Sequence, residues 1–283
     1  MSASTLDHPI VRMRTLVQAA CVAACCIIAV VAHAFPINAA DAVFNDGFEP
    51  YAGIGPTQTC PYTPDGNGFF TLTSPASNYA VRLPPGYDAQ NPQPQRLLVA
   101  IHGCGDNAMN FATWAASPYA SRSTQDYIAI SIGGRDGACW SIGTDDALVS
   151  AAITHVSSCF YVHQHKVVLA GYSSGGGLAY HLAMTDSRRY AGVLIENSSL
   201  SSAVGGAGNV NAALNATWWK INVAHSARIG DMSYAIAGVQ TDRDKMLAHD
   251  FPLQYRELDG THNGTSDDWS DFLIPKMTNW VSP

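Results

Sequence analysis

The sequence has few charged residues for its length. Only 13% of its 283 residues are Asp, Glu, Lys or Arg, and the 22 acidic and 15 basic residues give a net charge of −7. Lysine and arginine form no basic run, whereas a nucleic-acid surface needs such residues clustered. The composition therefore argues against a nucleic-acid partner.

The sequence also lacks repeats, low-complexity tracts and a C-x-x-C pair, so a zinc site is not expected. Three of its seven cysteines fall in the first 34 residues. The other four are an even number, which in an exported chain favours two disulfides. They are Cys60, Cys104, Cys139 and Cys159.

The N-terminus is typical of a secretory signal. Arg12 and Arg14 precede an apolar run over residues 16–32, and an A-x-A cleavage site ends at Ala34. An uncleaved membrane anchor is one alternative, but the run is rich in Ala rather than Leu. A lipoprotein is another, since residues 22–25 resemble a lipobox, but the apolar run continues well past Cys25. We therefore expect a signal peptide over 1–34, a secreted or periplasmic protein, and no stable membrane association after cleavage.

Residues 35–75 are rich in turn-forming residues and are predicted to be a linker before a catalytic domain over 76–283. In that domain, short apolar β-rich runs alternate with helical stretches. This pattern predicts an α/β fold with a mostly parallel central sheet, helices on both faces and ligands at the carboxyl ends of the strands. The expected strands cover residues 79–83, 97–101, 127–132, 167–172, 191–195, 221–224 and 253–258.

The pentapeptide Gly171-Tyr172-Ser173-Ser174-Gly175 has the G-x-S-x-G pattern of a nucleophile elbow. It follows a predicted strand and precedes a helical stretch of small residues over 176–184, as this motif requires. Ser173 is therefore the candidate nucleophile. Its hydroxyl needs a base, and in this kind of fold an acid and then a histidine follow the serine in the chain.

His262 is the best candidate base, because it lies in a glycine-flanked loop directly after the last predicted strand. Asp231 is the best acid, since it follows the strand over 221–224 and a polar turn. The competing residues, which we interpret as structural or less well placed, are His181, His225, His249, Asp242, Asp244 and Asp259.

An oxyanion hole needs two backbone N–H donors. The N–H of Ser174 is the first candidate, because it directly follows the nucleophile. The loop over 102–105, after the strand over 97–101, offers the second, for which we choose Cys104 with Gly103 as the alternative.

Topology also favours one disulfide pairing. Cys104 and Cys139 both follow predicted strands and should lie at the carboxyl edge of the sheet, whereas Cys159 ends a helix and should lie at the opposite edge. A Cys104–Cys139 bond would leave Cys60 for Cys159, although the sequence does not exclude the other two connectivities.

The chain resembles secreted α/β-hydrolases of the polyhydroxybutyrate-depolymerase and feruloyl-esterase type. The resemblance covers roughly residues 78–280, and it implies an α/β-hydrolase fold, Ser173, Asp231 and His262 as the triad, and carboxylic ester hydrolysis without a metal or cofactor. The stretches that carry it are 79–87, 101–105, 139–141, 145–146, the elbow and 260–262.

The short stretch between residues 195 and 221 leaves no room for a cap domain, so the site should be open and suited to an ester attached to a polymer. Trp140 and Tyr172 are expected to contact this substrate, and Trp218 and Trp219 could line the same cleft. The predicted function is a serine esterase acting on feruloyl or acetyl esters of plant polysaccharide. A polyhydroxyalkanoate depolymerase, a secreted peptidase and a non-catalytic binding protein are the alternatives.

Overall fold

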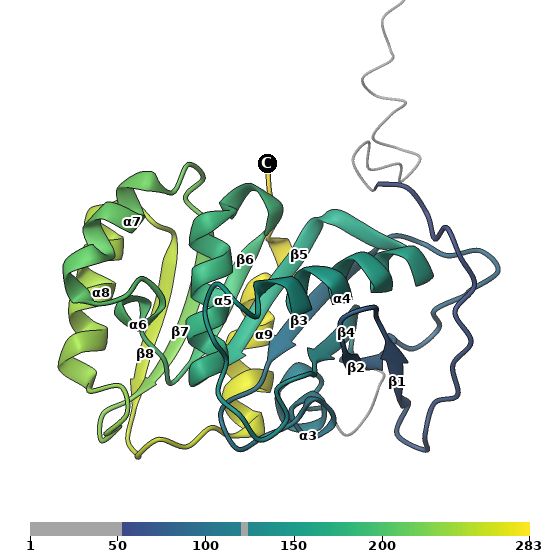
Figure 1. Cartoon of the computed structure of the whole chain (residues 1–283), viewed down its shortest axis with the longest axis horizontal. Helices are drawn as coiled ribbons and strands as arrows, with labels where there is room; N and C mark the ends of the chain where they lie inside the picture. Colours follow the sequence, from purple (N-terminus) through teal and green to yellow (C-terminus); the bar gives the residue numbers. More distant parts are fainter. Residues whose placement is uncertain (1–52, 120–123) are drawn as a thin grey trace, which may run out of the picture. The chain divides into compact units, whose positions relative to one another are not determined.

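A computed structural model describes residues 53–119 and 124–283 (Figure 1). The predicted signal peptide and the first part of the predicted linker lie outside the described residues. Eight strands form one sheet in the order β1-β2-β4-β3-β5-β6-β7-β8. These strands are β1 (Phe69–Thr73), β2 (Asn78–Arg82), β3 (Gln95–Ile101), β4 (Tyr127–Ile132), β5 (Val162–Tyr172), β6 (Gly192–Glu196), β7 (Asn222–Arg228) and β8 (Leu253–Leu258).

The sheet from β4 to β8 is parallel, and β2 pairs antiparallel with both β1 and β4. The helices are α3 (Ala108–Phe111), α4 (Asp146–Cys159), α5 (Ser174–Thr185), α6 (Leu200–Ala203), α7 (Val210–Ala216), α8 (Ile236–Ala248) and α9 (Ile274–Lys276). Shorter or wider helical turns are η1 (Ala112–Ala116), η3 (Ser187–Arg189), η4 (Ala207–Asn209), η5 (Asp268–Leu273) and η6 (Met277–Asn279).

Helices cover both faces of the sheet because alternate strand residues point to opposite sides. In β3, Leu97 and Val99 join the core beneath α4 and α5, whereas Leu98 joins a second core. Phe111 of α3 and Trp269 of η5 belong to that second core. Figure 1 shows α4 and α5 in front of the sheet and α9, in yellow, behind it. The predicted mostly parallel sheet between two helical layers is therefore confirmed.

Strand β1 was not predicted, and it lies inside the segment assigned to the linker. Phe69, Phe70 and Leu72 are buried, and the strand pairs with β2 along its whole length. Strands β5 and β7 are also longer than expected. Their extra residues include polar ones such as His163 and Ser226, which interrupt the apolar pattern although the fold buries them. Burial at these positions is decided by neighbouring strands, which a local pattern does not report.

The parallel strands end at one edge of the sheet. The turns that follow β3, β5, β6, β7 and β8 carry Gly103, Ser173, Asn197, Asp231 and His262. The connection from β6 to β7, which is described in full, consists of α6, η4 and α7 and has no separate cap domain. The chemistry-bearing residues therefore meet at the edge where ligands bind in such folds.

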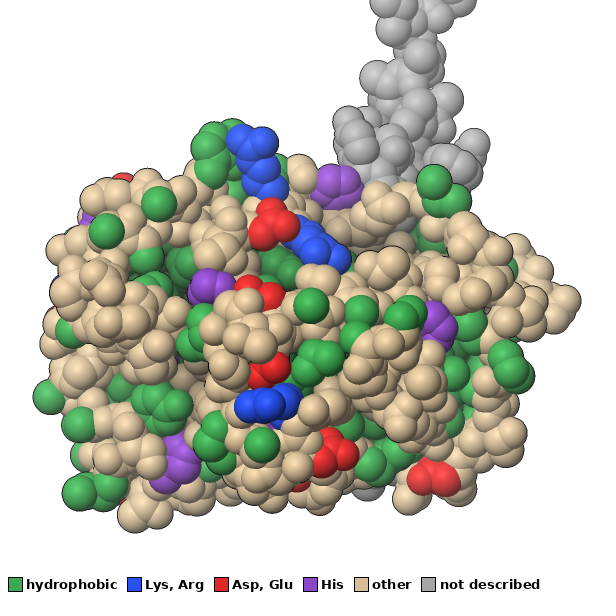
Figure 2. Space-filling view, viewed as in Figure 1, with side chains coloured by type: hydrophobic (Ala, Val, Ile, Leu, Met, Phe, Trp, Pro, Cys, Tyr) green, Lys and Arg blue, Asp and Glu red, His purple; other side chains and the backbone are tan. Residues whose placement is uncertain are grey.

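Charged side chains are sparse on the face shown in Figure 2, where the Lys and Arg side chains stand apart from one another. Within the described residues, no helix combines the length and apolar character needed to cross a membrane.

Candidate active site

The turn between β5 and α5 is a strained elbow. Ser173 has φ 54° and ψ −123°, a left-handed backbone that side chains rarely adopt. A Cβ on Gly171 would clash with the carbonyl of Gly175, and one on Gly175 would clash with the carbonyl oxygens of Ile101 and His102. Both glycines are thus required by close backbone approach, and the turn presents Ser173 at the sheet edge.

Ser173, His262 and Asp231 form one hydrogen-bonded chain. The Ser173 Oγ lies 2.8 Å from His262 Nε2, and His262 Nδ1 lies 2.7 Å from Asp231 Oδ2. Because a carboxylate only accepts, Nδ1 carries the proton and Nε2 is left to accept from the serine hydroxyl. This arrangement fits a nucleophile, a base and the acid that orients the base.

The Asp231 carboxylate is itself fixed in place. Its Oδ1 accepts from the backbone N–H groups of Ser233, at 2.7 Å, and Tyr234, at 3.0 Å. Its side chain is only 1% exposed. The backbone of the turn after β7 therefore holds the carboxylate that faces the imidazole.

The loop after β3 lies directly against the nucleophile. A Cβ on Gly103 would come 2.6 Å from the Tyr172 ring and 3.2 Å from the Ser173 Cβ. In the described part of the chain, the backbone N–H groups of Cys104 and Ser174 donate to no protein acceptor. Both predicted oxyanion donors are therefore available beside Ser173, as an oxyanion hole requires.

Two disulfides join Cys104 to Cys139 and Cys60 to Cys159. These are the pairs that the ends of strands and helices favoured. The Cys104–Cys139 bond ties the predicted oxyanion loop to the turn after β4, so it restrains the backbone that would hold the oxyanion.

Trp140, which was predicted to contact substrate, lies against the loop after β3. It is buried, with 7% exposed, and its indole N–H donates to the carbonyl of His102 at 2.7 Å. Trp140 thus supports the loop from below. Trp218 and Trp219 are exposed but precede the amino end of β7, at the edge opposite Ser173, and Arg188 stacks over Trp218.

Tyr172, also predicted to contact substrate, lies against His262. The two ring centroids are 5.3 Å apart, and the Tyr172 hydroxyl donates to the His262 carbonyl at 3.0 Å. A second ring, that of Tyr234, lies 5.6 Å from the His262 ring. Sequence reasoning missed Tyr234, although its place three residues after the candidate acid was a usable signal. The two tyrosines restrict the orientation of the imidazole.

Buried polar groups hold the rest of the histidine loop. The Asn263 carbonyl accepts from Asn197 Nδ2 at 2.7 Å and from Arg228 Nε at 3.2 Å. Asp268 in turn pairs with Arg228 and with Arg256, the latter at 2.6 Å. The loop that carries His262 is therefore anchored through its own backbone to a charged network from β6, β7, β8 and η5.

Glu196 is a further member of this network that sequence reasoning missed. It ends β6 and is completely buried. Burial and the neighbouring Asp268 carboxyl raise the pKa of Glu196 well above its ordinary value. Its backbone carbonyl also accepts from the N–H of Ser173 at 3.1 Å. A carboxyl at the end of an otherwise apolar strand was the signal available in the sequence.

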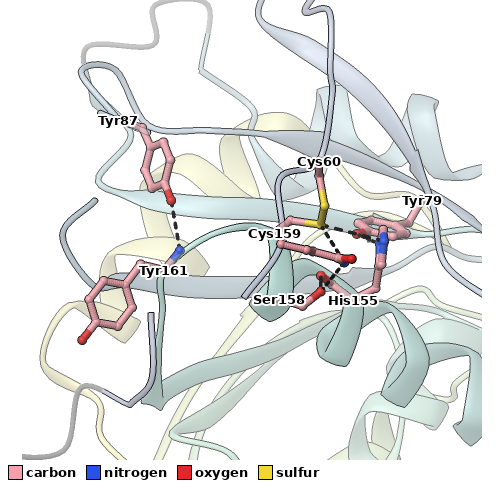
Figure 3. The surroundings of a disulfide bond; sticks show 8 residues. Cys60, Tyr79, Tyr87, His155, Ser158, Cys159 and Tyr161 are labelled. Carbon is pink, nitrogen blue, oxygen red and sulfur yellow. Dashed lines mark hydrogen bonds between the residues drawn. A yellow bond between two sulfur atoms is a disulfide. The ribbon is translucent and has the colours of Figure 1, made fainter. Parts of the chain in front are cut away.

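Among the described residues, one cluster brings three potential metal ligands together. They are Cys60, His155 and Cys159, whose ligand atoms lie within 4.8 Å of one another (Figure 3). Both sulfurs are bonded in the disulfide, so neither is a thiolate that could bind a metal ion. His155 Nδ1 instead shares a 2.8 Å hydrogen bond with the Tyr79 hydroxyl. The cluster therefore fits a structural cross-link.

Solved structures share this architecture. An S-formylglutathione hydrolase from Staphylococcus aureus matches with a TM-score of 0.59 and 15% identity, over 77% of this chain and 97% of that one. A ferulic acid esterase from Anaeromyces mucronatus matches with a TM-score of 0.56 and 12% identity, over 78% of this chain and 97% of that one. The chain has the α/β-hydrolase fold.

Curated relatives of this α/β-hydrolase are feruloyl esterases. A probable feruloyl esterase C from Aspergillus niger is 29% identical over 134 residues, which is 45% of this chain and 48% of the relative. The feruloyl esterase C of Emericella nidulans is 25% identical over 134 residues, with the same coverage. The match thus spans about half the length of these relatives. No protein-family model matches the chain.

Proposed function

We propose that this α/β-hydrolase is a serine esterase that cleaves carboxylic esters through Ser173, His262 and Asp231. The observation that carries the proposal is the continuous pair of hydrogen bonds, 2.8 Å and 2.7 Å long, that links the three side chains. Two further observations support the proposal: the strained backbone at Ser173, and the N–H groups of Cys104 and Ser174, which donate to no acceptor in the described part of the chain.

In the acylation step, His262 Nε2 takes the hydroxyl proton of Ser173 while Oγ attacks the ester carbonyl carbon. The carbonyl oxygen gains the negative charge and is stabilised by the N–H groups of Cys104 and Ser174. Asp231 stabilises the imidazolium that forms. Collapse of the tetrahedral intermediate breaks the bond to the alkoxy oxygen, which leaves with the proton from His262.

Deacylation reverses these roles with water. His262 takes a proton from water, the resulting hydroxide attacks the acyl-enzyme carbonyl, and the same two N–H groups stabilise the second oxyanion. Ser173 then leaves the acyl carbon and recovers its proton from His262. The products are a carboxylic acid and an alcohol, and one water is consumed.

We propose feruloyl or acetyl esters of plant polysaccharide as the substrate class. The similarity to proteins named feruloyl esterases supports an aromatic acyl group. The absence of a cap domain between β6 and β7, in a segment described throughout, supports access for an ester attached to a polymer. Export is part of the same proposal. The two disulfides support it, because such bonds persist in oxidising compartments.

The test is hydrolysis of p-nitrophenyl acetate, methyl ferulate and a hydroxybutyrate ester by the mature chain and its Ser173→Ala variant. We expect the variant to lose about 10⁴-fold or more in kcat/KM. The preferred ester identifies the acyl group, and preference for the hydroxybutyrate ester would favour a polyhydroxyalkanoate depolymerase. A serine-directed phosphonate should label the wild type alone. A folded, oxidised wild type with neither activity nor labelling would instead be a binding protein.

A further inference from the structure

A pocket of about 390 Å³ opens beside the candidate active site, between α6 and α8. It is lined by small and hydroxyl-bearing residues, and none of the described side chains that line it carries a charge. Those that matter here are Ser199, Ser201, Ser202, Tyr234, Ala235 and Gly238. Over α6 and α8, the surface in Figure 2 is mostly uncharged. The pocket therefore suits an uncharged ligand.

The two walls of the pocket are tied together. The Ser201 N–H, at the start of α6, donates to Asp242 Oδ2 of α8 at 2.7 Å. Lys245, also on α8, donates through Nζ to the carbonyl of Ala207 in η4 at 2.8 Å. These contacts connect α6 and η4 to α8, so the pocket is formed before a ligand arrives.

Four serines line the pocket, and the hydroxyl protons of two of them are already donated within the protein. Ser201 Oγ donates its proton to Ser199 Oγ, at 3.3 Å, and Ser202 Oγ donates to the Ser199 carbonyl, at 2.7 Å. A hydroxyl has one proton and two lone pairs, so Ser201 and Ser202 offer only lone pairs to a ligand. Ser199 and Ser233 also line the pocket, and their hydroxyl protons have no acceptor among the described residues. The pocket therefore offers both acceptors and donors, which suits the hydroxyl groups of a sugar because these also donate and accept.

Tyr234 joins the pocket to the catalytic chain. Tyr234 lines the pocket, and its ring centroid lies 5.6 Å from that of the His262 ring. During ester cleavage the leaving alcohol takes its proton from His262, so the alcohol must lie beside the imidazole. The pocket is thus next to the alcohol part of the ester.

We propose that the pocket between α6 and α8 is the subsite for the alcohol part of the substrate, and that it takes an uncharged, polyhydroxylated alcohol such as a monosaccharide unit. This inference rests on the proposed esterase function. A polyhydroxyalkanoate chain fits less well, because its internal ester groups only accept hydrogen bonds and would leave the lone pairs of Ser201 and Ser202 without a donor.

Gly238 allows the subsite to be filled without disturbing the elbow. It lies in α8 and lines the pocket, and a Cβ there would meet nothing within 4 Å. We compare the wild type with Gly238→Leu and Gly238→Ala. Ala237→Leu is the matched control, because Ala237 is an exposed neighbour on α8 that does not line the pocket. The substrates are the ferulate esters of methanol and of arabinose.

We expect Gly238→Leu to lower kcat/KM for the arabinose ester by about tenfold or more, through KM, while the methyl ester changes by less than about twofold. Gly238→Ala should show a smaller loss on the arabinose ester, and Ala237→Leu should leave both esters unchanged. If thermal unfolding shows that Gly238→Leu does not fold, the smaller loss expected in Gly238→Ala tests the subsite instead.

Equal losses on the two esters, or no loss on either, would overturn the subsite. A change that follows the acyl group, measured with methyl acetate beside methyl ferulate, would also overturn it, because the pocket would then bind the acid. Failure of the esterase proposal is distinguishable, since the wild type would then hydrolyse none of these esters and would not react with the phosphonate.

Discussion

Glu196 Oε2 lies where a side chain on Gly264 would have to go. A Cβ built on Gly264 would come within 2.6 Å of that oxygen and 2.9 Å of the Trp114 ring. Gly264 follows His262 by two residues, so the buried carboxyl of β6 and the histidine loop are in direct contact. This contact explains why position 264 is glycine, and it links the protonation of Glu196 to the packing of the loop.

Replacing Glu196 with Gln should alter how stability depends on pH. The raised pKa means that the folded chain keeps a proton which the unfolded chain releases above pH 4.5. Rising pH therefore favours unfolding of the wild type through this group, and stability is lost as pH approaches the folded pKa. The side chain of the Glu196→Gln variant cannot ionise. As pH rises, the free energy of unfolding of this variant, measured with urea, should therefore exceed that of the wild type by up to about 1.4 kcal/mol more for each pH unit.

Glu257→Gln is the control variant, because it makes the same exchange of a carboxylate for an amide at another position of the sheet. Glu196→Ala should cost about 2–4 kcal/mol below pH 4.5, because it leaves a cavity, and this cost should shrink as pH rises because alanine cannot ionise either. Parallel stability curves for the wild type and Glu196→Gln would contradict a proton held by Glu196 in the folded chain.

Asp231→Asn should lower kcat about 10³–10⁴-fold on any ester the wild type hydrolyses. The amide would lose the charge that stabilises the imidazolium and could present its N–H₂ to Nδ1, which would favour the wrong tautomer. Asp259→Asn is the control, since Asp259 is exposed and lies in the same loop as His262. Steady-state kinetics of the two variants decide between the acids, and a comparable loss in Asp259→Asn would refute the assignment.

Removal of either disulfide should lower stability, but removal of only one of them should also lower activity. The bonds close separations of 99 residues for Cys60–Cys159 and 35 residues for Cys104–Cys139, which corresponds to about 5 and about 4 kcal/mol of chain entropy. Paired serine variants should therefore lose comparable stability. Only the Cys104/Cys139 variant should also lose kcat, because only that bond restrains the predicted oxyanion loop. Full activity in that folded variant would show that the loop needs no cross-link.

His225 should contribute to acid unfolding. Burial lowers the pKa of His225 from 6.5 to about 3, and its Nδ1 shares a 3.0 Å hydrogen bond with the Tyr180 hydroxyl. Below pH 6.5 His225 binds a proton in the unfolded chain but not in the folded chain. The stability present above that pH is therefore lost as pH falls towards 3. His225→Gln should flatten the acid limb of a plot of unfolding free energy against pH. His249→Gln serves as the control, and an unchanged acid limb in His225→Gln would contradict the prediction.

The sequence by itself determined the local features. The G-x-S-x-G elbow could be predicted because its glycines are required by contacts within a few residues or by the adjacent strand. The order of Ser173, Asp231 and His262 could be predicted because parallel strands bring their carboxyl ends to one edge, so a residue after one strand meets residues after others. The same topology favoured the pairing of Cys104 with Cys139.

Only the tertiary structure decided what each side chain touches. Trp140 was expected at an open cleft. In the structure it is buried, and its indole N–H donates to the carbonyl of His102. Tyr234 and Glu196 attracted no attention in the sequence, because a phenol or a carboxyl after a strand is usually solvated. Both residues matter because of groups far along the chain. Tyr234 lies against His262, and Glu196 is influenced by Asp268. Burial and partners are properties of the assembled sheet edge, so no local pattern encodes them.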